Sequence, residues 1–249
     1  MQAIRFELSG RTAFFKKPDV NTYYYFTYGT IHKLALLGVM GSVLGLGGYN
    51  KQNENSKNQV FPEFYEKLKS AEVAIITCNN QGYITKKIQS FNNSVGYASL
   101  EQGGNLIVKE QWLQDPRWIV YVKLDETTEE FAEMLLSNRA KFIPYLGKND
   151  HFADITNVKK LELQQVQAVK NIHSLFKTKD FQVDTYIDDD EVEDDFISWR
   201  YQEYLPVALD EELNQYIFED FTGTNIPVKN TKDIVLYKDN ELDKVVYLF

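Results

Sequence analysis

Two short segments of the sequence hold the side chains best suited to bind a phosphate backbone. The first, RTAFFKKPDVNTYYYFTY over residues 11–28, combines the cations Arg11, Lys16 and Lys17 with the tyrosines Tyr23, Tyr24, Tyr25 and Tyr28. Lysine and arginine neutralise phosphates, and tyrosine rings stack on unpaired bases. This combination predicts a site for single-stranded nucleic acid. The alternative is a strand and loop whose rings fill a core while the lysines stay solvated.

The second segment is PYLGKNDHFADI, residues 144–155. Gly147 permits backbone conformations that let a phosphate approach amide groups. A charge, an amide and an imidazole follow at Lys148, Asn149 and His151. Histidine and lysine also carry protons when RNA is cleaved without a metal, as the 2′-hydroxyl attacks the adjacent phosphate. The segment therefore suits either RNA binding alone or metal-independent cleavage by His151 and Lys148.

The remaining reactive groups indicate no other chemistry. We expect His32 to be a helix-capping or surface residue and His173 to be half-buried. Three scattered histidines and the single Cys78 offer no zinc spacing. The glycines at 41–48 fit neither a phosphate loop nor a dinucleotide fingerprint. The acidic run 188–195 lacks the spacing of a calcium loop and is typical of a solvated surface loop. We expect no metal and no organic cofactor.

Charge is distributed unevenly along the chain. The 249 residues have a net charge of −9, which by itself opposes nucleic-acid binding. Residues 1–100 hold eleven Lys and Arg against six Asp and Glu, a balance of +5, whereas residues 101–249 hold sixteen against thirty, a balance of −14. The basic half is thus the half with the motifs. The acidic half repels nucleic acid, meets basic neighbours, or only keeps the protein soluble.

The chain is long enough to bury a substantial core. No signal peptide is recognisable at the N-terminus. The apolar run 34–46 is too short to span a bilayer. A single cysteine fits a reducing compartment. We expect a soluble cytoplasmic protein without a membrane contact.

The apolar pattern predicts the elements that position the two segments. Expected helices cover Thr30–Leu46, Pro62–Ser70 and a stretch from Thr127 or Thr128 to Arg139, and a polar linker covers Asn50–Gln59. Expected strands cover Gln2–Ser9, Glu72–Thr77, Leu106–Trp112, Trp118–Leu124 and Phe142–Tyr145, with a turn at Asp115 and Pro116. The order strand, helix, strands, helix, strand predicts an α+β fold of the ferredoxin-like plan.

The first expected helix has a face of small residues. Gly38, Gly41, Ser42 and Gly45 fall three and four positions apart. Each glycine inside a helix costs up to about 1 kcal/mol relative to alanine. We therefore expect another backbone, a sheet or a ligand to approach this face closely, with tight packing on a sheet as the simplest cause.

Two further regions complete the pattern. The polar segment from Asn79 to Asn105 is too long for a hairpin turn. Its Lys86 and Lys87 either bind phosphate or are exposed lysines on an amphipathic turn. In the last third we expect a small strand-rich appendage, with strands at Ile197–Val207, Ile226–Val228, Ile234–Tyr237 and Val245–Phe249, and turns at Thr222–Thr224 and Asp239–Asn240.

Three places in the sequence resemble the CRISPR-associated Cas-five family of the RAMP superfamily. They are the opening strand Ile4–Gly10, the block Phe14–Tyr49 with FFKKP, TY, LLG and LGLGGY, and the glycine loop Pro144–Ile155. Their order over the first two thirds of the chain carries the resemblance. It implies an RNA-recognition-like domain over residues 1–157 with a thumb inserted at about 79–105, and a C-terminal region over 158–249 that includes the acidic loop.

The family caps the 5′ handle of the guide RNA (crRNA) in type I Cascade surveillance complexes, and the sequence is most similar to members from type I-B systems. The resemblance implies a non-catalytic role, a thumb that contacts RNA and the Cascade backbone subunit, and a place near the large PAM-reading subunit and the target DNA. Some members cleave precursor RNA, so a metal-independent endoribonuclease is one alternative. A protein-interaction module without RNA is another. The expected RNA-binding residues are Arg11, Lys16, Lys17, Tyr23, Tyr28, Lys86, Lys87, Gly147, Lys148, Asn149 and His151.

Overall fold

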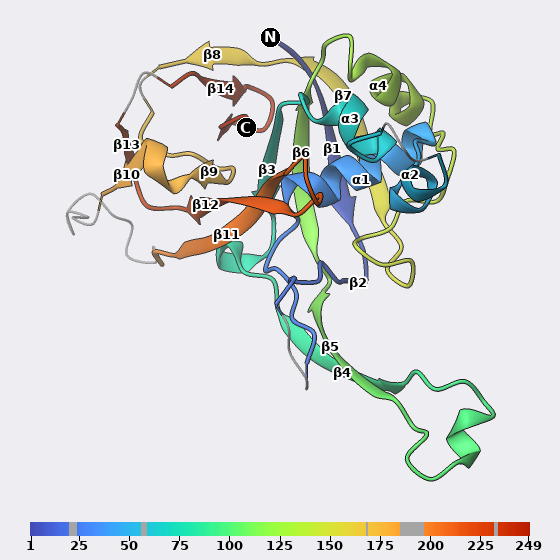
Figure 1. Cartoon of the computed structure of the whole chain (residues 1–249). Helices are drawn as coiled ribbons and strands as arrows, with labels where there is room; N and C mark the ends of the chain where they lie inside the picture. Colours follow the sequence, from blue (N-terminus) through green and yellow to red (C-terminus); the bar gives the residue numbers. More distant parts are fainter. Residues whose placement is uncertain (20–23, 56–58, 168, 185–196, 232–233) are drawn as a thin grey trace.

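A central antiparallel sheet organises the first two thirds of the chain (Figure 1). The computed structural model describes residues 1–19, 24–55, 59–167, 169–184, 197–231 and 234–249. Within these residues, the central sheet has four strands in the order β3 (Val73–Thr77), β6 (Arg117–Lys123), β1 (Gln2–Ser9) and β7 (Asp154–Glu162). Each neighbouring pair is antiparallel. Along the chain, α1 (Lys33–Leu44) lies between β1 and β3, and α4 (Glu129–Leu136) lies between β6 and β7.

Alternation along the strands gives the central sheet two different faces. Ile4, Phe6 and Leu8 of β1 are fully buried in the main core. Arg5 and Glu7, between them, point to the opposite face, because successive side chains of a strand alternate. The first face packs under α1, α3 (Glu63–Leu68) and α4. The opposite face is partly covered by the C-terminal region.

Helix α1 is apolar nearly all round because it is enclosed by α3, α4 and β11 (Arg200–Leu209). His32 caps it: the Nδ1 atom accepts the backbone N–H of Ala35 at 3.3 Å. The capping prediction is therefore confirmed, whereas a surface position is wrong, since His32 is 4% exposed. Burial lowers the pKa of His32 to about 3.

The small residues of α1 have separate causes. At Gly41, a Cβ atom would lie 2.7 Å from the Cβ of Phe64 on α3, so the expected close approach is real and comes from a helix. Gly45 ends α1 in the left-handed region at φ +77°, which favours glycine. At Gly38, a Cβ would meet no atom of the described residues within 4 Å.

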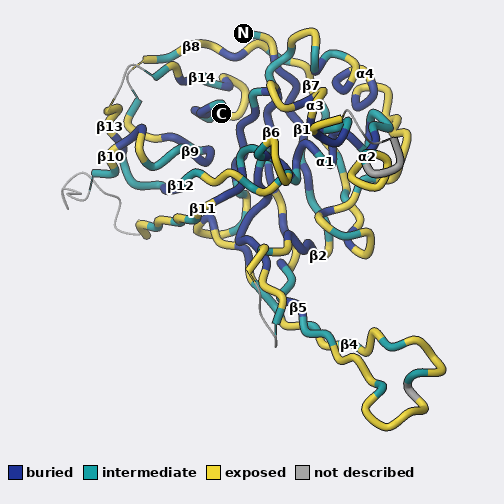
Figure 2. The backbone as a smooth tube through the Cα atoms, in the orientation of Figure 1, coloured by how far each residue is buried: buried dark blue, intermediate teal, exposed yellow. Residues whose placement is uncertain are grey.

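A long two-stranded ribbon projects from the body (Figures 1 and 2). It consists of β4 (Lys86–Asn92) and β5 (Ile107–Gln114), with the short helix η2 (Ala98–Leu100) towards its far end. We call residues 86–114 the arm. Its inner end pairs with β2 (Thr12–Ala13). The predicted excursion therefore forms most of the arm, and β5 belongs to the arm and not to the central sheet.

The C-terminal region is rich in strands, but it shares the core of the N-terminal part. Leu205 and Phe221 belong to the same buried cluster as the central sheet and α1. Leu163 and Val246 pack against Ala3 on the opposite face of the sheet. The strands expected in this region thus share part of their core with the central sheet. The strands here are β8 (Gln164–Val166), β9 (Phe176–Lys177), β10 (Phe181–Val183), β11, β12 (Tyr216–Thr224), β13 (Val228–Asn230), β14 (Leu236–Asp239) and β15 (Lys244–Val246).

Residues 142–145 form no strand apart from an isolated bridge between Tyr145 and Phe152. The N–H groups of Lys141 and Phe142 instead donate to the carbonyls of Val43 and Ser42 at the end of α1, so they are not free to join a sheet. The last strand of the central sheet is β7. The predicted domain boundary at residue 157 falls inside it, and β7 stays paired with β1 as far as Glu162.

Two other elements differ from the prediction. Helix α2 (Tyr49–Asn55) occupies the first part of the expected polar linker, and the ring of Tyr49 packs edge-on against Phe64. The expected turn at 222–224 lies inside β12, where Gly223 makes room for Leu175. The acidic run 188–195 lies outside the described residues. No helix in the described part of the chain is both long and apolar enough to cross a membrane.

Candidate nucleic-acid interface

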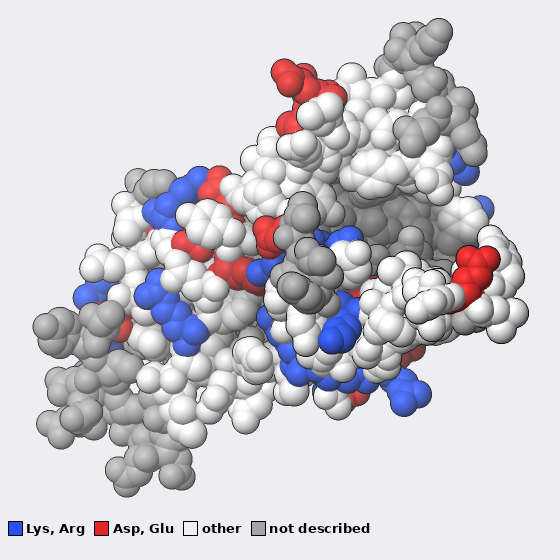
Figure 3. All heavy atoms as spheres, turned by 60° about the horizontal axis from the view of Figure 1, so that its bottom comes forward, with Lys and Arg blue, Asp and Glu red and all other residues white. Residues whose placement is uncertain are grey.

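The root of the arm, where β4 and β5 leave the body, brings the predicted segments together. Tyr25 pairs with the edge of β5: its N–H donates to the carbonyl of Lys109, and its carbonyl accepts the N–H of Gln111, both at 2.9 Å. The glycine loop (residues 144–155) joins from the other side, because the Phe14 N–H donates to the carbonyl of Leu146 at 3.1 Å. Figure 3 shows Lys and Arg side chains gathered around this place, with acidic groups among them.

Within the described residues, five lysines around the arm root lie over aromatic rings. Two of them, Lys17 over Tyr28 at 5.1 Å and Lys148 over Phe91 at 5.2 Å, also have carboxylate partners there, and three do not. The Lys16 Nζ lies 4.0 Å from the ring centre of Tyr25. The Lys109 Nζ lies 5.2 Å from the ring centre of Tyr24, and the corresponding distance from Lys87 to Trp112 is 5.7 Å. None of the three lysines has an ion pair with an acidic side chain of the described residues. A ring positions an ammonium without neutralising it, so these charges stay available to a phosphate.

Two other expected cations are already paired with carboxylates. The Lys17 Nζ lies 2.5 Å from Glu203 Oε1 on β11. The Lys148 Nζ lies 3.2 Å from Glu110 and 3.4 Å from Asp150. Burial by itself would lower the pKa of Lys148, but these carboxylates outweigh it and raise the pKa, so the side chain stays charged. A phosphate must compete with these partners.

Strand geometry separates lysines that are neighbours in sequence. Lys86 lies opposite Leu113 and Lys87 opposite Trp112, so the two lysines point to opposite faces of the ribbon. Lys87 shares its face with the glycine loop. Lys86 is half-buried on the other face: burial lowers its pKa, while the charge of Glu203 acts against that shift. We call these the glycine-loop face and the Glu203 face.

Gly147 is required by its backbone conformation and its surroundings. Its φ is +88°, and a Cβ there would lie 2.0 Å from the carbonyl oxygen of Phe14. The close approach expected at this glycine is thus to another segment of the chain. Asn149, two residues on, is exposed beside the glycine-loop face.

His151 lies inside the arm root. Its side chain is 1% exposed, and its Nδ1 is 2.6 Å from the Thr12 Oγ1. Its ring stands at right angles to Trp112, with the ring centres 4.6 Å apart. Burial lowers the pKa of His151, which keeps the imidazole neutral. The Nε2 atom is buried and finds no hydrogen-bond partner among the described residues. The ring is therefore not presented to solvent.

The other expected residues are dispersed. Tyr28 is 2% exposed, so for this ring the core interpretation applies. Arg11 is exposed at the turn that leads into β2. Tyr23 lies outside the described residues.

Sequence reasoning missed Lys109, Trp112 and Glu203 as members of the arm root. Lys109 and Trp112 were assigned only to a strand. Glu203 carried a usable signal. It lies two residues before the core residue Leu205 on β11, so both side chains point to the same face of the strand, and a carboxylate at an inward position must find partners.

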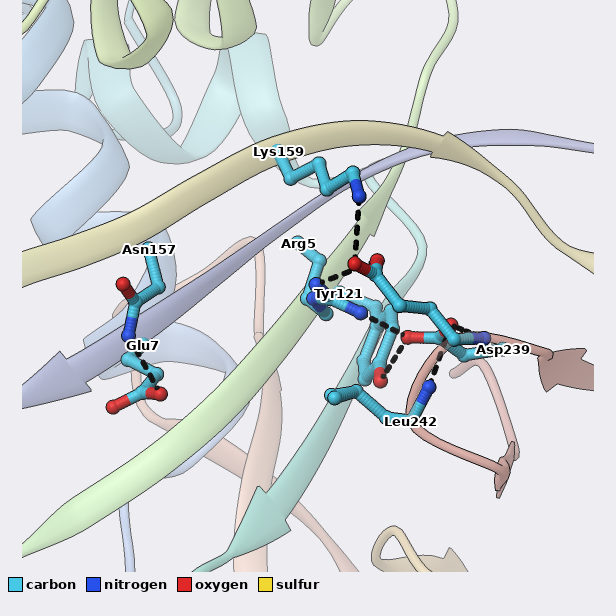
Figure 4. A network of polar contacts seen from close by, with 8 residues as sticks. Arg5, Glu7, Tyr121, Asn157, Lys159, Asp239 and Leu242 are labelled. Atoms are coloured by element: carbon cyan, nitrogen blue, oxygen red, sulfur yellow. Dashed lines mark hydrogen bonds and ion pairs between the residues drawn. The ribbon is translucent and has the colours of Figure 1, made fainter.

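A second candidate, on the opposite face of the central sheet, is a cavity of about 390 Å³. It is lined by Arg5, Glu7, Asn157 and Lys159 among others. Figure 4 shows that these groups pair with one another or with the β14–β15 turn. The charged groups of this cavity therefore already have partners within the chain. In the described part of the chain, no group of three or more His, Cys, Asp or Glu side chains is placed to hold a metal ion.

Comparison with known proteins places the fold. No family model matches the sequence, and no curated protein matches it. Among solved structures, a chain of a "CRISPR RNA-guided surveillance complex" aligns with a TM-score of 0.53 at 10% identity, over 92% of this chain and 91% of that chain. The fold is similar to that of CRISPR-associated proteins. A CRISPR protein from Archaeoglobus fulgidus aligns with the same TM-score and identity, over 99% of this chain and 98% of that one.

Proposed function

We propose that this chain is a non-catalytic RNA-binding subunit of a type I CRISPR surveillance complex, most like type I-B, which caps the 5′ handle of the crRNA and anchors the backbone filament. The shared fold with a chain of a surveillance complex supports the proposal. So does the central sheet: the order β3-β6-β1-β7, with a helix in each crossover, is the one expected of a ferredoxin-like domain.

The observation that carries the proposal is the convergence at the arm root. Three segments from residues 12–28, 86–114 and 146–151 meet there, although they are far apart in the sequence. Ring-seated lysines beside exposed aromatic side chains are what a single-stranded nucleic acid requires. We assign phosphate contacts to Lys16, Lys87 and Lys109, and a contact with Asn149 at the edge of the glycine loop. Lys148 would join them where RNA displaces Glu110.

The far end of the arm suits a protein partner. Residues 93–106 contain one charged residue, Glu101. Tyr97 and Leu100 are 76% and 88% exposed. Large exposed apolar side chains on a projecting tip with a single charge are typical of a contact surface. We assign it to the neighbouring backbone subunit, and we expect the PAM-reading subunit and the target DNA nearby in the same complex.

The test is to purify the tagged chain from cells that carry its neighbouring genes and to sequence the 5′ ends of the RNA that accompanies it. A uniform repeat-derived end is expected. Lys87→Ala should lower the RNA recovered at moderate salt, and its matched control Lys86→Ala should not, because Lys86 is half-buried close to the carboxylate of Glu203. RNA with random ends, or none, would instead favour the protein-interaction module.

The geometry does not favour the endoribonuclease alternative. A general base must reach the proton that it removes. His151 is buried between Trp112 and Thr12 in this structure, away from any surface where a 2′-hydroxyl would lie. A repeat-RNA cleavage assay in chelator should show no cutting by the wild type. Cutting that disappears in His151→Ala would overturn the non-catalytic assignment.

A further inference from the structure

Glu203 sits at a core-facing position of β11. It lies two residues before Leu205, on the same face of the strand, and Leu205 is 2% exposed in the main core. The Glu203 side chain is only 13% exposed. A carboxylate in such a place is costly unless donors surround it. The Oε2 atom accepts the Gly29 N–H at 2.8 Å and the Tyr201 hydroxyl, and the Oε1 atom accepts from the Lys17 ammonium at 2.5 Å.

These contacts hold both ends of one loop. Lys17 and Gly29 flank this loop, whose described residues 24–28 we call the aromatic segment. The two sides of the loop pair with each other: the Lys17 N–H donates to the Phe26 carbonyl at 2.8 Å, and the Tyr28 N–H to the Phe15 carbonyl at 2.9 Å. The outer side then pairs with β5 through Tyr25. Glu203 therefore ties the C-terminal sheet to the strand that carries the ring under Lys16.

Glu203 makes the neighbouring lysines Lys16 and Lys17 differ in whether their charge is already paired. The Lys16 ammonium lies over Tyr25 without an acidic partner in the described residues, while the Lys17 ammonium is held by Glu203. Lys86 lies near the same carboxylate. Of the charged groups on the Glu203 face of the arm, Lys109 alone, over Tyr24, is placed further out along β5.

We propose that Glu203 is a positioning and specificity-determining residue of the RNA interface: it withholds Lys17 from RNA and fixes the aromatic segment, so that Lys16, Lys87 and Lys109 define the path of the backbone. This inference rests on the proposed RNA-binding function. Glu203 contacts no RNA in it. The residue acts as an internal counter-ion that keeps the Lys17 charge out of that path.

Salt dependence of binding measures the effect, because each phosphate contact adds about 0.7 to the slope of log affinity against log salt for a single strand. The full chain is titrated with a single-stranded RNA of the CRISPR-repeat sequence at several salt concentrations. In Glu203→Gln, the amide oxygen still accepts from Gly29 and Tyr201, but Lys17 is released. The slope should steepen by about 0.7. Adding Lys17→Ala in that background should restore the wild-type slope.

The matched control is Glu219→Gln. Glu219 lies on β12, the partner strand of β11, and pairs with Lys179 at 2.6 Å, so its substitution makes the same change in net charge away from Lys17. Its slope should equal that of the wild type. A purely structural role for Glu203 would change affinity without the Lys17-dependent change of slope.

Three outcomes would overturn the inference: an unchanged slope in Glu203→Gln, the same steepening in Glu219→Gln, or a steepening that Lys17→Ala leaves in place. If Glu203→Gln fails to fold, Lys17→Ala alone decides: its slope should match the wild type, and a slope shallower by about 0.7 would show that Lys17 already contacts RNA. If no variant binds RNA, wild type included, the proposed function itself fails and the inference with it.

Discussion

Two carboxylates of the C-terminal region each hold a cation from the first seventeen residues, in opposite surroundings. Asp239, 1% exposed, accepts from Arg5 at 2.5 Å and from the Tyr121 hydroxyl at 2.9 Å on the far face of the central sheet (Figure 4). Glu203 holds Lys17 at the arm root, where the lysine side chain is 28% exposed. The first contact is closed to water and joins two parts of the fold. The second lies at the margin of the interface, where a polyanion competes for the same lysine.

The largest effect is expected when the contact between Arg5 and Asp239 is broken. Asp239→Ala leaves Arg5 and Tyr121 without their shared partner, and removal of one member of a buried pair costs about 3–5 kcal/mol. The free energy of unfolding, measured in urea, should fall by that amount. Glu241→Ala is the control: Glu241 also accepts from Arg5, at 3.0 Å, but its side chain is 47% exposed, so a far smaller loss is expected. Equal losses of stability in the two variants would refute the role of Asp239 as the buried partner of Arg5.

Acidification should remove part of the same contribution. Burial by itself would raise the pKa of Asp239, but the hydrogen bonds from Arg5 and Tyr121 outweigh it and lower the pKa. The unfolded chain therefore takes up this proton at a higher pH than the folded chain does. The contribution of ionised Asp239 to the free energy of unfolding is complete above about pH 4, and it is lost as the pH falls through the lower pKa of the folded state. The gap in unfolding free energy between wild type and Asp239→Asn should thus narrow below about pH 4. A gap that stays constant would contradict this.

At the arm root, the glycine loop offers the next largest effect. Gly147→Ala forces a left-handed residue and a clash with the Phe14 carbonyl, and strain of this kind costs about 1–3 kcal/mol. Displacement of the loop should also weaken RNA binding, through Lys148 and Asn149. Gly48→Ala is the control, because no atom of the described residues lies within 4 Å of its Cβ position. Unfolding midpoints and RNA affinity measured together check both effects, and an unchanged Gly147→Ala protein would refute the packing argument.

The smallest expected effect is a difference in RNA affinity between variants of the neighbouring lysines Lys16 and Lys17. Lys16→Ala should lower RNA affinity about fourfold at roughly 0.15 M salt, since one phosphate contact is lost. Lys17→Ala should leave affinity nearly unchanged, because Glu203 already holds that charge. A filter-binding titration of the full chain distinguishes them. If Lys17→Ala weakens binding as much as Lys16→Ala, the contrast between the lysines of the arm root is wrong.

Elements with a strong local pattern were predictable. Strand β1 occupies the residues expected from its alternation, and α4 begins after Thr128 as expected. The errors come from distant contacts. The strand expected at 142–145 was lost because its backbone donors bind the end of α1. The turn expected at Gly223 became strand because the glycine accommodates Leu175 from another segment.

The candidate site divides in the same way. Residue types indicated that Lys16, Lys87 and the glycine loop belong to a phosphate site. No sequence pattern, however, shows which of two adjacent lysines faces a carboxylate 186 positions away, as Lys17 does with Glu203. That choice depends on strand register and on the docking of β11, both of which are tertiary features. The sequence was thus informative about composition of the interface and silent about its internal pairing.

The bond between Arg5 and Asp239 joins residues 234 positions apart. Ribosomes add about 5–20 residues per second, so roughly 10–50 seconds separate the synthesis of the two partners. During that time β1, the strand beside β6 and β7 in the sheet, carries an arginine whose counter-ion does not yet exist. The last step of folding therefore awaits nearly the whole chain, and a nascent protein interrupted before β14 would present Arg5 without its carboxylate partner to the RNA-rich surroundings of the ribosome.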